Sequence, residues 1–143
     1  MRRGLAALER TQQLAGALGP FALQAAIAAC HARARTAEET DWTRISALYD
    51  ALAQLTQSPV VELNRAVAYA MAFGPASGLE IADKLTSDPA LETYHLLPSV
   101  RADFLAKLGR FGEARAELER AASLTRNTRE RTLLLERARK LGT

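Results

Sequence analysis

Hydrophobic residues recur every three or four positions along most of the chain, the spacing of one face of an α-helix. Between Pro59 and Gly74, for example, the apolar stripe consists of Val60, Leu63, Val67, Ala70 and Met71. No stretch shows the period-two alternation that marks a β-strand. The pattern predicts about eight helices, over residues 3–15, 20–34, 41–55, 59–73, 75–85, 96–108, 113–124 and 127–141.

Prolines and capping residues mark the ends of these helices. Three proline-containing pairs, at 19–20, 58–59 and 74–75, put proline in a first helical turn, where its missing N–H costs no hydrogen bond. Pro98 is expected to do the same in a helix that starts near Leu96, after a lead-in over the preceding residues. The candidate N-caps are Thr40 or Asp41, Ser58 and Asn127.

The helices recur in pairs. Gly74 and Gly109 each end a helix and lie 35 residues apart (109 − 74 = 35), close to the 34-residue period of tetratricopeptide repeats. Residues 101–114 resemble the best-defined part of that motif, with small residues where two helices approach closely. We predict an all-α fold in which antiparallel helix pairs stack as a short, right-handed, tetratricopeptide-like solenoid. A single domain over residues 1–143 would contain repeats at 20–57, 58–89 and 95–126 and a C-terminal capping helix at 127–141.

The composition agrees with closely packed helices. Of 143 residues 48% are hydrophobic but only 6% are aromatic, so alanine and leucine supply most of the apolar surface. The longest apolar runs are too short to cross a bilayer, and the first residues do not form a signal-peptide core. We therefore expect a cytoplasmic protein. Its one cysteine, Cys30, excludes an intramolecular disulfide.

Charge is distributed unevenly. Residues 1–40 carry 5 basic and 3 acidic side chains, residues 41–100 carry 3 and 7, and residues 101–143 carry 11 and 6. The basic end suggests a nucleic-acid-binding helical module as an alternative function. Acidic residues that can pair with neighbouring arginines interrupt that basic run, which favours a solvated helix face. The basic residues concerned are Arg126, Arg129, Arg131, Arg137, Arg139 and Lys140.

The sequence offers little catalytic chemistry. Two histidines and one cysteine cannot form a metal site of known spacing, and adjacent Cys30 and His31 point about 100° apart on a helix. The glycine-containing run 74–78 lacks the Lys-Ser/Thr ending of a phosphate-binding loop. We therefore expect no enzyme, no cofactor and no metal.

Several longer stretches carry a more specific signal. The run 19–31 reads GPFALQAAIAACH and the run 58–68 reads SPVVELNRAVA, with shorter matching blocks at 40–42, 94–98 and 101–103. These stretches resemble the C-terminal extension of a group of bacterial ECF-type RNA polymerase sigma factors. The resemblance runs from about Gly4 to Leu141.

In that family, promoter-binding sigma modules precede a tetratricopeptide-like extension. The resemblance implies a regulatory protein–protein interaction domain that controls transcription initiation through contacts with the sigma core or a partner protein. Its expected partners are the promoter-binding modules of the same protein or a small regulatory protein. RNA polymerase would be reached indirectly, and neither DNA nor a membrane would be contacted by this domain.

A binding groove in such arrays is lined by the first helix of each repeat. Transferring this register predicts a partner-binding groove made of Gln24, His31, Asn64, Arg65, Met71, Ser99, Arg101, Asp103 and Lys107. For Arg65 and Arg101 an alternative is that each pairs with acidic neighbours between helices. For Asn64, partner binding and hydrogen bonding between helices are both open.

Overall fold

The computed structural model describes residues 19–34 and 37–141, and these residues form helices and connecting turns without a β-strand. The expected helix over 3–15 lies outside this part of the chain. Within these ranges the α-helices are α2 (Pro20–Arg33), α3 (Trp42–Thr56), α4 (Pro59–Phe73), α5 (Pro75–Leu85), α6 (Leu96–Lys107), α7 (Phe111–Leu124) and α8 (Thr128–Lys140). Two short 3₁₀ turns, η1 (Ala37–Glu39) and η2 (Pro89–Leu91), lie between α2 and α3 and between α5 and α6.

The helix ends follow the predicted caps. The side chain of Asp41 accepts a hydrogen bond from the Arg44 amide at 3.1 Å, and Asn127 accepts one from the Glu130 amide at 3.1 Å. α6 begins at Leu96, which puts Pro98 in the first turn as predicted. These bonds satisfy amides that have no partner within the helix.

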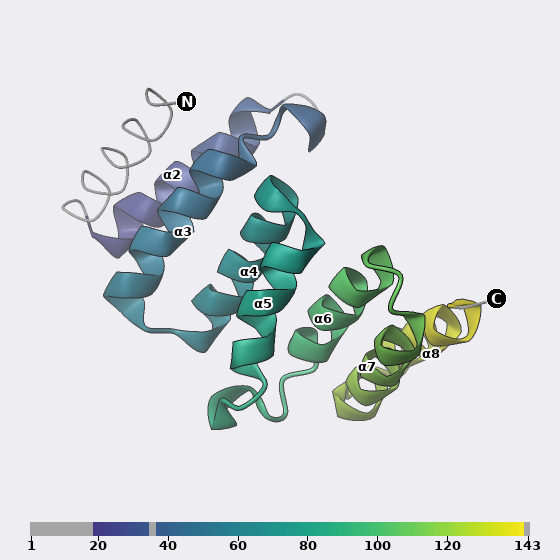
Figure 1. The fold of residues 1–143 in the computed structure, drawn as a ribbon. Coiled ribbons are helices and arrows are strands. Elements are labelled where there is room, and N and C mark those ends of the chain that lie inside the picture. Colours follow the sequence, from purple (N-terminus) through teal and green to yellow (C-terminus); the bar gives the residue numbers. More distant parts are fainter. Residues whose placement is uncertain (1–18, 35–36, 142–143) are drawn as a thin grey trace.

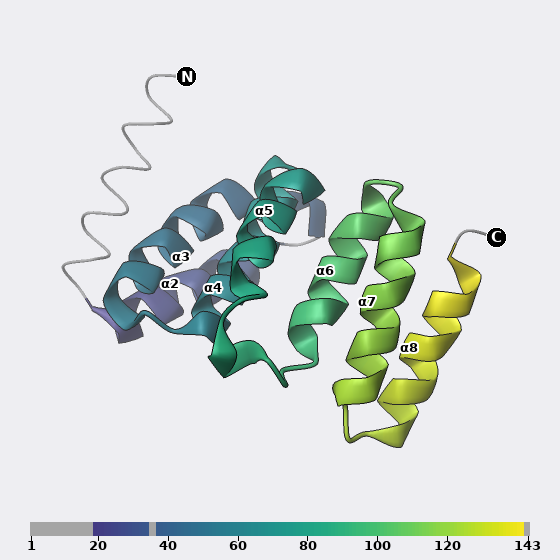
Figure 2. The ribbon, with the colours of Figure 1, turned by 60° about the horizontal axis from the view of Figure 1, so that its bottom comes forward.

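Helices that are neighbours in the sequence pack against one another in order, and α4 also contacts α6. In Figure 1, α2 and α4 lie behind α3 and α5. Figure 2 shows α6, α7 and α8 side by side at the other end of the molecule, with α8 outermost. No helix among the described residues is long and apolar enough to cross a membrane.

Three hydrophobic cores run through the described helices, and each draws on at least three helices. The first core contains Leu23, Ile27, Cys30, Ile45, Leu48, Ala51, Leu52, Val61 and Ala68, from α2, α3 and α4. The second contains Leu63, Ala66, Leu79, Ile81, Ala82, Leu85, Leu91, Leu97, Phe104, Leu105 and Ala114. The third contains Ala102, Leu118, Ala121, Ala122, Leu134 and Ala138, from α6, α7 and α8. Because α4 and α6 each contribute to two cores, they link successive helix pairs.

A glycine allows α5 to approach α4 and α6 closely. Gly78 of α5 is buried, and a Cβ added there would lie 2.6 Å from Ala70 Cβ, 2.7 Å from the Ala66 carbonyl oxygen and 2.9 Å from Phe104 Cζ. The first two atoms belong to α4 and the third to α6. Position 78 therefore has no room for a side chain, and its glycine sets the separation of three helices.

Candidate partner-binding surface

The centre of the candidate surface is an exposed stripe on α4. Val60 and Met71 are 43% and 46% exposed, and Asn64 lies between them on the same side of the helix. The helical spacing grouped Val60 and Met71 with the buried Leu63, yet both are exposed, and the repeat register had placed Met71 in the predicted groove. Val67, on one flank of the stripe, packs against the second core, and Ala68, on the other, belongs to the first core. The stripe is exposed because it lies between the two cores.

A second stripe lies on α6, which contacts α4. It contains the exposed Leu96, the partly exposed Ser99 and Asp103, and the exposed Lys107, whose ammonium nitrogen lies 3.0 Å from the Asp103 carboxylate. This ion pair is half-exposed on both sides, so it adds little stability and can exchange for a partner's charges.

Two predicted residues lie on α2. Gln24 and His31 are exposed, and the His31 ring meets the ring of Trp42 edge to face with centroids 5.4 Å apart. The first core connects α2 to α4, because Leu23 and Ile27 share it with Ala68. All nine predicted groove residues lie at least partly exposed on α2, α4 and α6, but Arg65 and Arg101 make contacts between helices. The other seven are Gln24, His31, Asn64, Met71, Ser99, Asp103 and Lys107.

Arg65 has a different role from its neighbour Asn64. It points toward α3, where Nη1 donates to the Asp50 carboxylate at 3.1 Å, and Nη2 donates to Glu62 at 3.3 Å. Its guanidinium also lies 5.1 Å from the centre of the Tyr69 ring, close enough for a cation–π contact. These contacts match the alternative interpretation of Arg65 as a link between helices.

The same cluster shifts the ionisation of its members. Burial raises the pKa of Tyr69 to about 12, and the hydrogen bond from its hydroxyl to Asp50, 2.7 Å long, acts in the same direction. Burial lowers the pKa of Arg65, but Glu62 and Asp50 outweigh this and raise it overall. Arg65 therefore stays charged at every accessible pH. A polar cavity of about 320 Å³ opens beside the cluster, lined by Asp50, Ala53, Gln54, Glu62 and Arg65.

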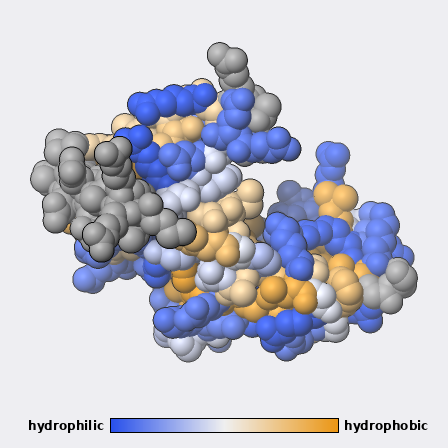
Figure 3. Space-filling model, turned by 45° about the horizontal axis from the view of Figure 1, so that its top comes forward, coloured by the Kyte–Doolittle hydropathy of each residue, from blue (hydrophilic) through white to orange (hydrophobic). Residues whose placement is uncertain are grey.

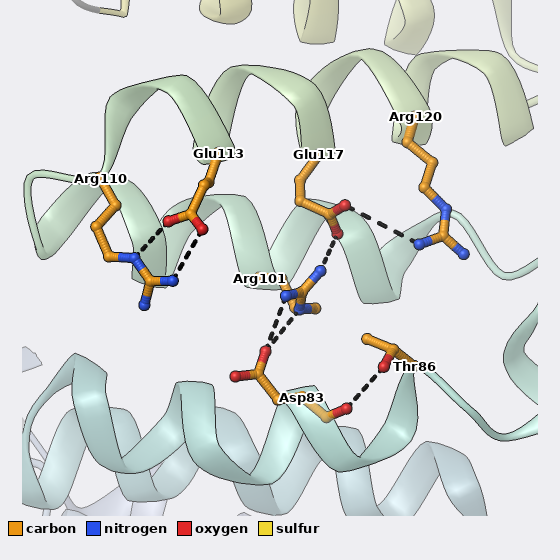
Figure 4. Close-up of polar contacts among 7 residues, drawn as sticks. All are labelled: Asp83, Thr86, Arg101, Arg110, Glu113, Glu117 and Arg120. Carbon is orange, nitrogen blue, oxygen red and sulfur yellow. Dashed lines mark hydrogen bonds and ion pairs between the residues drawn. The ribbon is translucent and has the colours of Figure 1, made fainter.

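Arg101 of α6 likewise makes contacts between helices, and Figure 4 shows them. Its Nε and Nη2 lie 3.0 and 2.8 Å from Asp83 Oδ1 in α5, and its Nη1 lies 2.7 Å from Glu117 Oε2 in α7. Arg120 lies at the edge of this group, 4.0 Å from Glu117. Arg101 therefore joins three helices and points away from the α6 stripe.

The acidic partners of these arginines were not assigned by the sequence. Asp50 precedes Arg65 by 15 residues and Asp83 precedes Arg101 by 18. Neither spacing follows the i, i+4 rule for a single helix, so only the packing of separate helices identifies the pairs.

Figure 3 shows the side of the molecule on which α4 and α6 end, with hydrophobic residues gathered in its middle and hydrophilic residues around them. The exposed hydrophobic side chains at the adjoining helix ends are Met71, Phe73, Leu108 and Phe111. Within the described ranges, no three His, Cys, Asp or Glu side chains come together as metal ligands. The surface places apolar, amide and charged side chains next to one another, as Met71, Asn64 and Lys107 illustrate.

Comparison with known proteins identifies one informative relative. The chain is 46% identical over 112 residues to an uncharacterized protein of Rhizobium meliloti (strain 1021). The matched stretch covers 78% of this chain but 26% of the relative, so the chain spans about a quarter of that protein's length. No family model matches the chain.

Proposed function

We propose that this chain is a helical-repeat protein–protein interaction domain. In this proposal the pairs α2–α3, α4–α5 and α6–α7 are units of a short, right-handed, tetratricopeptide-like solenoid, and α8 is its capping helix. The order of helix packing and the sharing of cores between pairs support this architecture. The observation that carries the function is the α4 stripe, where Val60, Asn64 and Met71 remain exposed between two cores.

We further propose that the domain regulates an ECF-type sigma factor without catalysing a reaction. The resemblance of the stretches 19–31 and 58–68 to the extension of such factors supports this assignment. The relative is also much longer than the matched stretch, as expected for a domain joined to other modules. The partner would be the promoter-binding modules of the same protein or a small regulatory protein. RNA polymerase would be affected only through the sigma factor.

A calorimetric titration tests this function. The chain would be titrated with the promoter-binding modules of its parent sigma factor, prepared as a separate polypeptide, at moderate salt. We expect saturable binding that weakens about tenfold when Asn64 and Met71 are both changed to alanine, because both side chains lose contact area. Changing the exposed residues Glu80 and Lys84 of α5 to alanine is the matched control and should leave binding unchanged.

Absence of binding would contradict docking on the sigma core and direct the search to a separate regulatory protein. Equal weakening by both double variants would contradict the assignment of the α4 stripe. Circular dichroism of each variant separates either result from loss of folding.

A further inference from the structure

A second surface, distinct from the α4 stripe, lies between α7 and α8. It contains a cavity of about 410 Å³, within the size range of pockets that hold a ligand or an anchoring side chain. Its lining combines apolar groups with both signs of charge. The lining residues are Arg115, Glu119, Thr132, Leu135, Ala138 and Arg139.

The end of α8 is fixed in position beside this cavity. Arg115 of α7 donates from Nε to the Ala138 carbonyl at 3.2 Å and from Nη2 to the Leu141 carbonyl. A cation that binds the last carbonyls of a helix satisfies acceptors that would otherwise lack a partner. The cavity is therefore a preformed feature, held by the same arginine that lines it.

At the other end, α8 is fixed by Arg131 and Glu130. Arg131 donates to the Ala122 carbonyl at 3.1 Å and to the Thr125 carbonyl at 2.9 Å. Glu130 lies 2.8 Å from His95 and also accepts from the Thr125 hydroxyl. These two residues of α8 are thus committed to structure.

The outer side of α8 is basic and apolar at once. Arg129, Leu133 and Arg137 follow at four-residue spacing on one exposed side, and Leu133 is 54% exposed. Leu135, 40% exposed, and Arg139 lie on the opposite flank of α8, about 200° around the helix from Leu133 and Arg137, and they line the cavity. Figure 2 shows α7 packed on only one side of α8.

We propose that the α7–α8 surface binds an acidic amphipathic helix of a partner protein. A large apolar side chain of that helix would enter the cavity over Leu135 and Ala138, and its carboxylates would meet Arg139. Charge complementarity selects an acidic occupant, because the cavity lining carries two arginines, Arg115 and Arg139, against one glutamate, Glu119. The exposed Leu135 and Glu119 on the cavity lining favour a protein over a nucleic acid, whose phosphates Glu119 would repel. This surface does not depend on the α4 stripe.

The test uses a fluorescently labelled synthetic helix of about 18 residues, with leucines on one side and glutamates on the other, titrated with the whole chain. We expect binding in the micromolar range that weakens with added salt. Leu135→Ser and Arg139→Glu should each weaken it about tenfold, by removing the apolar contact and by reversing a charge. Arg44→Glu, the same charge reversal at an exposed residue of α3, is the matched control and should change binding less than about twofold.

Three results would overturn the proposal. The first is equal binding of a glutamate peptide without leucines, which would reduce the interaction to net charge. The second is tighter binding of a short DNA duplex that is lost in Arg139→Glu, which would assign the surface to nucleic acid. The third is self-association of the chain that Arg139→Glu abolishes, since the acidic residues 41–100 of a second copy would then be the occupant. Unchanged circular dichroism of the variants confirms that each result reports binding.

Discussion

Two arginines, Arg65 and Arg101, hold successive helix pairs together in similar ways. Each lies on the first helix of a pair and reaches back to an aspartate on the second helix of the pair before it. Arg65 binds Asp50 and Arg101 binds Asp83, so the arginines are 36 residues apart and the aspartates 33. The same type of contact thus recurs at close to the repeat spacing, although the arginine follows its aspartate by 15 residues in one case and by 18 in the other.

The two contacts differ in their second acidic partner. Arg65 takes Glu62 from its own helix, three residues earlier, and so joins two helices. Arg101 takes Glu117 from α7 and so joins three. The side chains of Arg101 and Glu117 are only 19% and 13% exposed, so water screens their attraction less than it would on an open surface. The comparison indicates that the junction around α5, α6 and α7 depends more on its arginine than the α3–α4 junction does.

Gly78→Ala should have the largest effect on stability, and it should act where α5 packs against α4 and α6. Its new Cβ would meet the Ala66 carbonyl oxygen, a backbone atom that cannot move aside cheaply, as well as Phe104 of α6. We expect a loss of about 3 kcal/mol in the free energy of unfolding, measured by urea denaturation. Gly112→Ala in α7 is the control, because nothing lies within 4 Å of its Cβ position. Equal stability of the two variants would contradict the tight approach at Gly78.

Removing each arginine tests the comparison directly. Arg101→Ala leaves the poorly exposed Glu117 without its close cation, and we expect it to cost about 2 kcal/mol. Arg65→Ala should cost about 1 kcal/mol, because Asp50 keeps its hydrogen bond from Tyr69. The double variant should lose the sum, since the two sites share no partner. The reverse order of the two single variants in urea denaturation would refute the stronger dependence on Arg101.

The stability of the α3–α4 junction should also depend on alkaline pH, through Tyr69. Its pKa is raised from 10.0 to about 12, mainly by burial, so the folded state holds its proton where the unfolded state releases it. The contribution of Tyr69 to stability is complete below its pKa in the unfolded state. It is lost as the pH rises through its pKa in the folded state. We expect stability to fall between about pH 10 and 12, and to fall less in Tyr69→Phe. Burial also raises the pKa of Tyr49, so part of the fall should remain.

The smallest effect is expected at a third arginine pair. Arg110 and Glu113 pair within one turn at the start of α7, beside the Arg101 group in Figure 4, and both are exposed. The hydrogen bond from Arg110 lowers the pKa of Glu113. The pair therefore stabilises the fold above the ordinary pKa of a carboxyl group, and this stabilisation is lost as the pH falls through the lowered pKa of Glu113. Glu113→Gln should leave the melting temperature near neutral pH almost unchanged. A loss of stability in Glu113→Gln as large as that in Arg101→Ala would contradict the idea that Arg101 stabilises the fold by joining three helices.

The helix ends were predictable from the sequence because caps act locally. Asp41, Asn127 and Pro98 occupy the positions that their side chains favour, and neighbours three residues away decide the outcome. The direction in which a side chain points on a packed helix was harder to predict from the sequence. Asn64 and Arg65 are adjacent in sequence, yet only the position of α3 determines that Arg65 turns inward to Asp50. The exposure of Met71 likewise depends on where two cores meet, which no single-helix pattern specifies.

The order in which the helices pack also bears on how the chain folds. Because each helix packs mainly on its neighbours in sequence, most stabilising contacts close short loops and cost little chain entropy. Chains with such local contacts fold quickly for their size. Pulling on the two ends should therefore detach helix pairs one after another from an end, while the pairs that remain stay folded.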